Sequence, residues 1–146
     1  MNNRVFIATP ISGFADDNEY RDYRYMVFNL IACLRKNAFE VYAEIENIEG
    51  SNEYDTPARS VEIDFENIRK CDYFILLHPR RMQSSSLIEF GYACALDKKI
   101  VAVGRKEDFP YLVIGYGAYS EKARIVDVDE LIQKDFPAIL ESIKSI

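Results

Sequence analysis

The most constraining feature of the sequence is an unbroken apolar run, YFILL, at residues 73–77. A strand with one face in water alternates apolar and polar residues, whereas a continuous run is typical of a parallel strand buried on both faces. Parallel strands need long crossover connections, which are usually helices. The run therefore predicts a parallel sheet that is covered by helices on both sides.

Short apolar segments alternate with helical patterns along the rest of the chain. The expected strands are residues 4–9, 39–43, 73–77, 100–103 and 125–128. The expected helices run from the cap residues Asp16, Asp17 and Asn18 to Asn37, from Thr56–Pro57 onward, over 84–96, and from Asp129 onward with an interruption or restart at Pro137. Residues 109–119 fit either a short helix or a loop. This alternation predicts an α/β fold, a flavodoxin-like or Rossmann-like three-layer sandwich with a five-stranded parallel sheet, and residues 1–146 are expected to form one domain.

The composition indicates an acidic globular protein, with a formal net charge of -6. Nucleic-acid binders are usually basic, so nucleic acid is not an expected partner. No apolar run reaches 18 residues, so no membrane association is expected. The scattered cysteines, Cys33, Cys71 and Cys94, are expected to be reduced thiols in a cytoplasmic protein. A single histidine, His78, argues against a zinc cluster.

The stretch SSSLIEFGYA, residues 84–93, places one carboxylate in the first turn of a predicted helix. Ser86 and Glu89 fit the S-x-x-E capping box, in which each residue satisfies a backbone amide at the helix start. A functional interpretation is also open, because this helix follows a buried strand and its start faces the ligand-binding edge of the sheet. Apolar neighbours favour a partly desolvated Glu89, which suits a nucleophile or a general acid/base.

Further candidate residues lie at the same edge of the predicted sheet or on the helix beside it. Asp64, in VEIDFENI, is a second carboxylate of interest, although its residue type alone favours an ordinary position on the flank of a helix. Hydroxyls and a glycine in the loops would admit a sugar or phosphate to backbone amides. The basic side chains there would contact a phosphate, and solvated loop charges are an equally good interpretation. The candidate substrate contacts are Thr9, Ser12, Gly13, His78, Arg80, Ser84, Ser85 and Ser86.

Several stretches resemble, in order and spacing, the nucleoside 2-deoxyribosyltransferase superfamily, including its branch of nucleoside 5'-monophosphate N-glycosidases. The stretches are VFIATPISGF, VEIDFENIRKCD followed by YFILL, SSSLIEFGYACALDKKIVAV and PYLVIGYGAYSEKARIVDVDEL. The resemblance implies an N-glycosidase or N-(deoxy)ribosyltransferase in which Glu89 attacks the anomeric carbon of a nucleoside or nucleotide. It implies that Asp64 orients the sugar or helps to protonate the leaving base. It also implies that no metal or organic cofactor is needed and that the protein is a homo-oligomer.

The sequence departs from the family pattern ahead of Glu89, where serines replace the usual glycine. The basic position that the monophosphate branch carries in its opening loop is Ile11 or Ser12 here, which leaves the choice between nucleoside and nucleotide open. The serine-rich approach also resembles TIR-like domains, which would imply an NAD hydrolase or cyclase that produces a signalling nucleotide. Asp64 fits the transferases better. A non-catalytic nucleotide-sensing module on the same fold is a further alternative.

Overall fold

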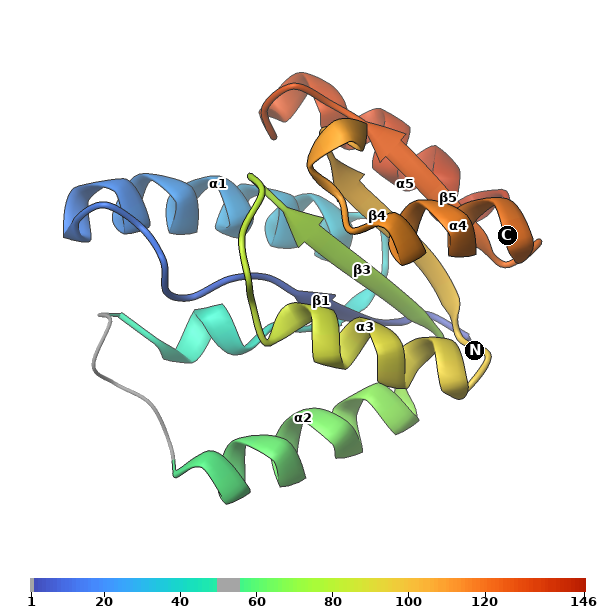
Figure 1. Ribbon diagram of the computed structural model, residues 1–146, viewed down its shortest axis with the longest axis horizontal. Coiled ribbons are helices and arrows are strands. Elements are labelled where there is room, and N and C mark those ends of the chain that lie inside the picture. Colours follow the sequence, from blue (N-terminus) through green and yellow to red (C-terminus); the bar gives the residue numbers. More distant parts are fainter. Residues whose placement is uncertain (1, 50–55) are drawn as a thin grey trace.

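The computed structural model describes residues 2–49 and 56–146 (Figure 1). Five parallel strands form one sheet in the order β2-β1-β3-β4-β5. The strands are β1 (Arg4–Ala8), β2 (Glu40–Tyr42), β3 (Tyr73–His78), β4 (Lys99–Gly104) and β5 (Ala123–Asp127). The flavodoxin-like sandwich with a five-stranded parallel sheet is therefore confirmed.

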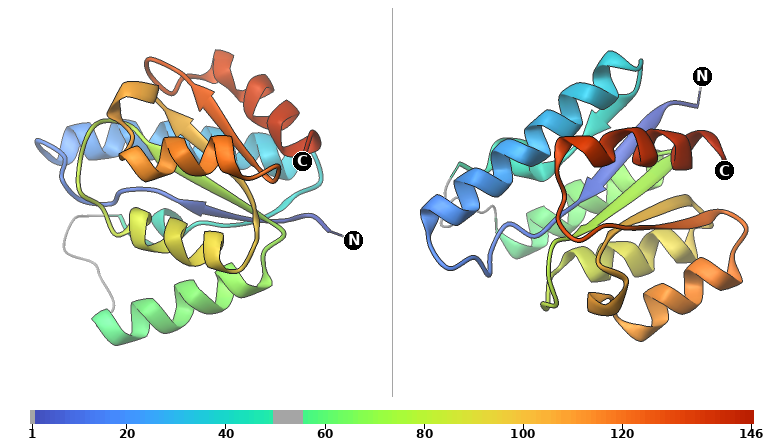
Figure 2. Two further views of the ribbon diagram at one scale, coloured as in Figure 1. Left: turned by 45° about the vertical axis from the view of Figure 1, so that its right-hand side comes forward. Right: turned by 90° about the horizontal axis from the view of Figure 1, so that it is seen from above.

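Five α-helices form the two outer layers. They are α1 (Asp17–Lys36), α2 (Pro57–Lys70), α3 (Ser86–Ala95), α4 (Tyr111–Tyr119) and α5 (Phe136–Lys144). Helices α1 and α5 cover one face of the sheet, and α2, α3 and α4 cover the other (Figures 1 and 2). Short 3₁₀ turns lie at Glu44–Asn47, Lys106–Asp108 and Gln133–Asp135.

The apolar strands fill both cores at once, because successive side chains of a strand point to opposite faces. Val5 and Ile7 of β1 belong to the core under α1 and α5. Phe6 belongs to the core under α2, α3 and α4, where its ring stacks on Phe74 of β3 at a centroid distance of 5.5 Å. Because β3 is buried on both faces of the sheet, polar and apolar residues do not alternate along it.

The predicted helix starts at Asp16 and Thr56 are confirmed. Asp16 Oδ1 accepts a hydrogen bond of 2.8 Å from the Glu19 amide at the start of α1. Thr56 Oγ1 accepts one of 3.4 Å from the Arg59 amide, and Pro57 occupies the first turn of α2. Side-chain oxygens at these positions satisfy amides that the helix itself leaves without partners.

The C-terminal third of the chain settles two expectations. The ambiguous segment at 109–119 forms a helix, α4. The prediction that the last helix begins at Asp129 is wrong, because α5 begins at Phe136 and Pro137 lies in its first turn. Proline is tolerated there because the amide that it lacks has no helical partner at that position.

The three cysteines are free thiols, with Cys71 buried and Cys33 and Cys94 half-buried. Burial raises the pKa of Cys71 and of Cys94 to about 11, which leaves both protonated and unreactive near neutral pH. Among the described residues, no helix has the length and apolar character needed to span a membrane.

Candidate active site

The connections of the sheet diverge between β1 and β3, since the chain leaves β1 towards β2 and returns on the other side to form β3. Ligands of such sheets bind at the carboxyl ends of the strands beside this switch point. A pocket of about 390 Å³ lies there, which is large enough for a nucleoside. Its lining residues are Thr9, Ile11, Ser12, Glu44, Pro57, Ser60, Val61, Asp64, Phe65, Ser84, Ser85, Ser86, Ile88 and Glu89.

Two carboxyl groups from different helices meet in this pocket. Asp64 comes from α2 and is buried, with 8% of its surface exposed, and Glu89 comes from the first turn of α3. Burial raises the pKa of Glu89 well above its ordinary value, and the charge of Asp64, a hydrogen bond with Asp64 and the charge of Glu44 raise it further. The pair therefore retains a shared proton at a pH where an isolated glutamate has lost its own.

The capping-box interpretation of Ser86 and Glu89 is wrong. Helix α3 begins at Ser86, so Ser85 occupies the cap position, and its side chain makes no capping bond. Ser84 Oγ instead accepts from the Ser86 amide at 3.2 Å and lies 2.8 Å from Ser86 Oγ. The Glu89 side chain is thus not held at the helix start, and it lines the pocket.

Tyr42 and Glu44 belong to the site, although the sequence analysis did not select them. The Tyr42 hydroxyl donates a long hydrogen bond of 3.5 Å to Asp64 Oδ1. Burial and the charge of Asp64 raise the pKa of Tyr42, which keeps the phenol protonated as a donor. Glu44 opens the turn after β2 and lines the pocket. Both residues stand at the carboxyl end of the predicted strand 39–43, and this was the signal that could have found them.

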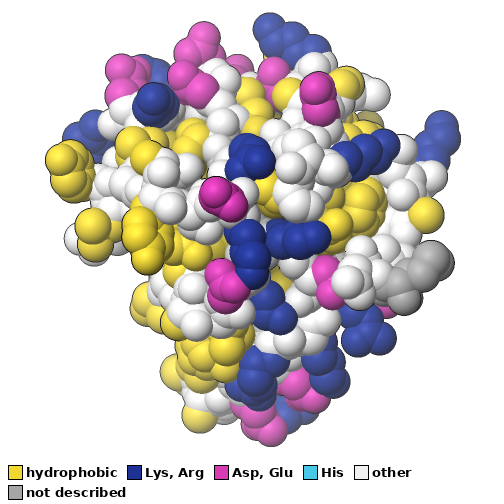
Figure 3. Space-filling view, turned by 90° about the vertical axis from the view of Figure 1, so that its right-hand side faces the viewer, with side chains coloured by type: hydrophobic (Ala, Val, Ile, Leu, Met, Phe, Trp, Pro, Cys, Tyr) yellow, Lys and Arg dark blue, Asp and Glu magenta, His cyan; other side chains and the backbone are white. Residues whose placement is uncertain are grey.

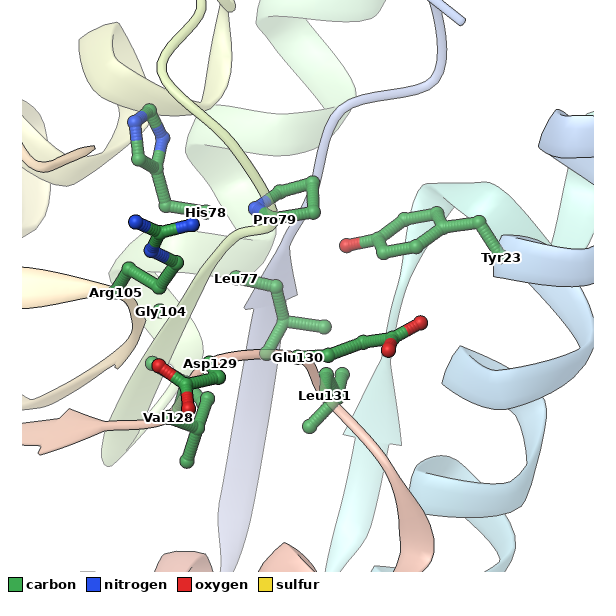
Figure 4. A pocket seen from close by; sticks show the side chains of 11 residues that line it. Tyr23, Leu77, His78, Pro79, Gly104, Arg105, Val128, Asp129, Glu130 and Leu131 are labelled. Carbon is green, nitrogen blue, oxygen red and sulfur yellow. The ribbon is translucent and has the colours of Figure 1, made fainter.

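His78 lies outside the pocket of Glu89. Its buried ring stacks on Phe109, with centroids 5.3 Å apart, and its Nε2 lies 3.1 Å from the carbonyl oxygen of Asp108. It lines a separate hollow of about 10 Å³, with Arg105 beside it and Tyr23 on the other side (Figure 4). That volume holds about one water molecule, so this hollow does not admit a nucleoside.

Arg80 and Gly13 also lie outside the residues that line the pocket. Arg80 forms an ion pair with Glu19 of α1, and its guanidinium lies 5.5 Å from the centre of the Phe14 ring. Gly13 has a φ of 85°, in the left-handed region that favours glycine, and packs against Met82. The pocket thus brings together Thr9, Ser12, Asp64, Ser84, Ser85, Ser86 and Glu89, and leaves Gly13, His78 and Arg80 apart.

Comparison with known proteins places this chain in a family. The family model described as nucleoside 2-deoxyribosyltransferase matches residues 5–128. The CMP N-glycosidase BcmB of Clostridium botulinum is 22% identical, with a TM-score of 0.70 over 95% of this chain and 98% of that chain. The solution structure of BlsM is 24% identical, with a TM-score of 0.78 over 97% of this chain and 90% of that chain.

At these identities the two solved structures show a shared fold. A search of curated proteins found no significant match. The family match spans most of the chain, from β1 through β5, and includes Asp64 and Glu89. The chain therefore belongs to the nucleoside 2-deoxyribosyltransferase family.

Proposed function

We propose that the protein cleaves or transfers the N-glycosidic bond of a nucleoside or nucleotide, with Glu89 as the nucleophile. The observation that carries this proposal is the meeting of Glu89 and Asp64 in one pocket, where burial and the charge of Asp64 raise the pKa of Glu89. Two carboxyl groups that flank a glycosidic bond are the usual apparatus of glycoside cleavage. Membership of the nucleoside 2-deoxyribosyltransferase family supports the reaction class.

In the reactive form of the pair, Glu89 is ionised and Asp64 carries the proton. A Glu89 carboxylate oxygen attacks the anomeric carbon and forms a glycosyl ester, while the bond from that carbon to the base nitrogen breaks. The base leaves with the electron pair and takes the proton from Asp64. Water then attacks the anomeric carbon, its proton passes to Asp64, the ester bond breaks, and the free sugar and the Glu89 carboxylate are released. Attack by an N–H nitrogen of a second base, with the same proton transfer, gives a new nucleoside.

Other residues of the pocket are suited to hold the substrate. The Thr9 hydroxyl lies 2.6 Å from the Tyr23 hydroxyl, which fixes its orientation towards a sugar. Phe65 offers an apolar wall for the base, and its ring is held by stacking on Tyr92 at 4.1 Å. A rigid aromatic wall positions a flat base at a low cost in conformational entropy.

Base release tests the proposal directly. The purified protein is incubated separately with nucleosides, nucleoside 5'-monophosphates and NAD, and free base is followed by chromatography. Release from a nucleoside or monophosphate is expected. Nicotinamide release from NAD alone would favour the TIR-like activity. A nucleotide that raises Tm without being cleaved would favour a sensor. Either result contradicts the proposal.

We also propose that the protein is a homo-oligomer that associates through α4. This helix carries no charged residue, yet Tyr111, Leu112 and Tyr119 are 91%, 81% and 84% exposed. These three side chains present roughly 500 Å², a large part of the ~800 Å² that each partner buries in a standard interface. An uncharged patch can face its own copy across a two-fold axis without repulsion between like charges.

Light scattering measures this association. The substitution Leu112→Glu is expected to convert the oligomer to a monomer, because a charge would be buried in an apolar contact. The matched control is Tyr25→Glu on α1, whose side chain is 69% exposed on the other side of the sheet. A monomeric wild-type protein, or equal dissociation by both substitutions, would contradict the assignment to α4.

A further inference from the structure

We propose that the pocket selects N-glycosides that have a free 5'-hydroxyl and a positively charged base. This inference rests on the proposed function, since it names the substrate class of the same site. Three features of the pocket support it. The described ionisable side chains that line it are acidic, part of its lining is aromatic and apolar, and the backbone amides at the start of α3 already have hydrogen-bond partners.

Among the described residues that line the pocket, the ionisable groups are all acidic. Glu44, Asp64 and Glu89 come from three different elements, and none of the described lining residues is Lys, Arg or His. A phosphate dianion would meet like charges at short range in a partly desolvated site, where Coulomb repulsion is strong. A cation would be attracted by the same groups.

The cation that fits this pocket is a flat aromatic ring. Across residues 2–49 and 56–146, no group of three His, Cys, Asp or Glu side chains is arranged to hold a metal ion. Among the described residues, the pocket is lined by one aromatic residue, Phe65, beside the apolar side chains of Val61 and Ile88, and Tyr92 is stacked on the Phe65 ring. Aromatic faces attract delocalised cations, most strongly when water is excluded. A positively charged nucleobase has both the charge that suits the acidic groups and the flat ring that suits Phe65.

The start of α3 is the obvious place for a phosphate, because helix N-termini bind anions through free amides. Here the amides of the first turn already have partners. The Ser86 amide donates to Ser84 Oγ at 3.2 Å, and the Leu87 amide donates to the Ser84 carbonyl at 3.0 Å. The amides of Ile88 and Glu89 both donate to the Ser85 carbonyl, at 3.0 and 3.2 Å. A phosphate would have to displace these bonds.

Many basic residues of the protein lie at the opposite edge of the sheet. Lys70 ends α2, Lys99 begins β4, and Lys98 Nζ donates to the carbonyl oxygens of Arg69 and Cys71. Figure 3 shows Lys and Arg side chains spread across the side of the molecule where the strands begin. Cations also stand at the carboxyl ends of the strands, where Arg80 and Arg81 follow β3 and Arg105 follows β4, but none of them is among the described residues that line the pocket.

Binding to the Glu89→Gln variant tests the charge on the base without turnover. Calorimetry compares 1-methyladenosine with adenosine and 3-methylcytidine with cytidine at pH 7, where the methylated member of each pair is cationic. The cation is expected to bind at least about tenfold more tightly in at least one pair. Adding Glu44→Gln should narrow this preference. Adding Glu46→Gln should not, because the Glu46 carboxylate is bonded to Arg35 at 2.7 Å and does not line the pocket.

Turnover by the wild-type protein tests the 5' position. The value of kcat/KM is expected to be at least about tenfold higher for a nucleoside than for its 5'-monophosphate, since the reacting bond is the same and only the charge differs. A preferred monophosphate, equal binding of charged and neutral bases, or binding of neither would overturn the inference. None of these results overturns the proposed function, which fails if neither a nucleoside nor a nucleoside 5'-monophosphate releases its base.

Discussion

Glu89→Gln is expected to lower kcat/KM for base release by about 10³-fold or more, because an amide does not replace a carboxylate as the attacking group. The variant keeps the size of the side chain and its place in α3, so substrate binding should survive. Rapid mixing with excess enzyme measures single-turnover cleavage directly. The matched control is Glu66→Gln on α2, which removes one exposed carboxylate that pairs with Lys70. Retained turnover in Glu89→Gln would contradict the proposed role.

The same variant should be more stable than the wild type, which separates loss of chemistry from loss of folding. The pKa of Glu89 is raised in the folded protein, so the folded state binds that proton more tightly than the unfolded chain. Stability is then lost as pH rises above the ordinary glutamate value of about 4.3. Gln does not titrate. The free energy of unfolding of Glu89→Gln should equal that of the wild type near pH 4 and exceed it by about 0.5–2 kcal/mol near pH 8. This difference is measured as a rise in Tm of a few degrees.

The fold could be predicted because hydrophobic burial and local capping point to the same structure. The unbroken YFILL run reports burial on both faces, and Asp16 and Thr56 mark helix starts through their own side-chain chemistry. Where local signals conflicted, the prediction failed. Asp129 is a good capping residue, but α5 begins at Phe136, whose side chain is buried in the core under α1.

The site could be predicted only where one residue carries the signal. Glu89 and Asp64 were found individually, but the pocket also depends on Glu44 and Tyr42, which strand order brings beside them. The pairing of β2 with β1 is a property of the sheet topology, and it cannot be predicted from the individual residues of either strand. The capping box failed for a related reason, since a shift of one residue at the start of α3 moves Ser86 from the cap into the helix.

The charge of Asp64 raises the pKa of Glu89, so Asp64→Asn should lower that pKa towards the ordinary value. The reactive pair carries one proton, so the raised pKa marks loss of that last proton and sets the basic limb of the pH profile of kcat/KM. Asp64→Asn removes the group that donates this proton, so the basic limb should disappear. Burial, which is the largest cause of the shift, remains in the variant, so ionisation of Glu89 should set an acid limb above the ordinary glutamate value. For neutral nucleosides the maximal rate should fall by about 10²-fold or more, because the leaving base loses its proton donor.

The choice of substrate distinguishes a proton donor from a residue that only orients the sugar. A pyridinium base such as nicotinamide leaves nicotinamide riboside as a neutral molecule and needs no proton. Asp64→Asn should therefore lower the maximal rate much less with this substrate than with a neutral nucleoside, although both substrates contain the same ribose. An equal loss of rate with both substrates would show that Asp64 only orients the sugar and does not donate a proton. Glu62→Gln, two residues earlier on α2 and paired with Arg59, removes the same charge outside the pocket. It should change neither the pH profile nor the ratio of the two rates.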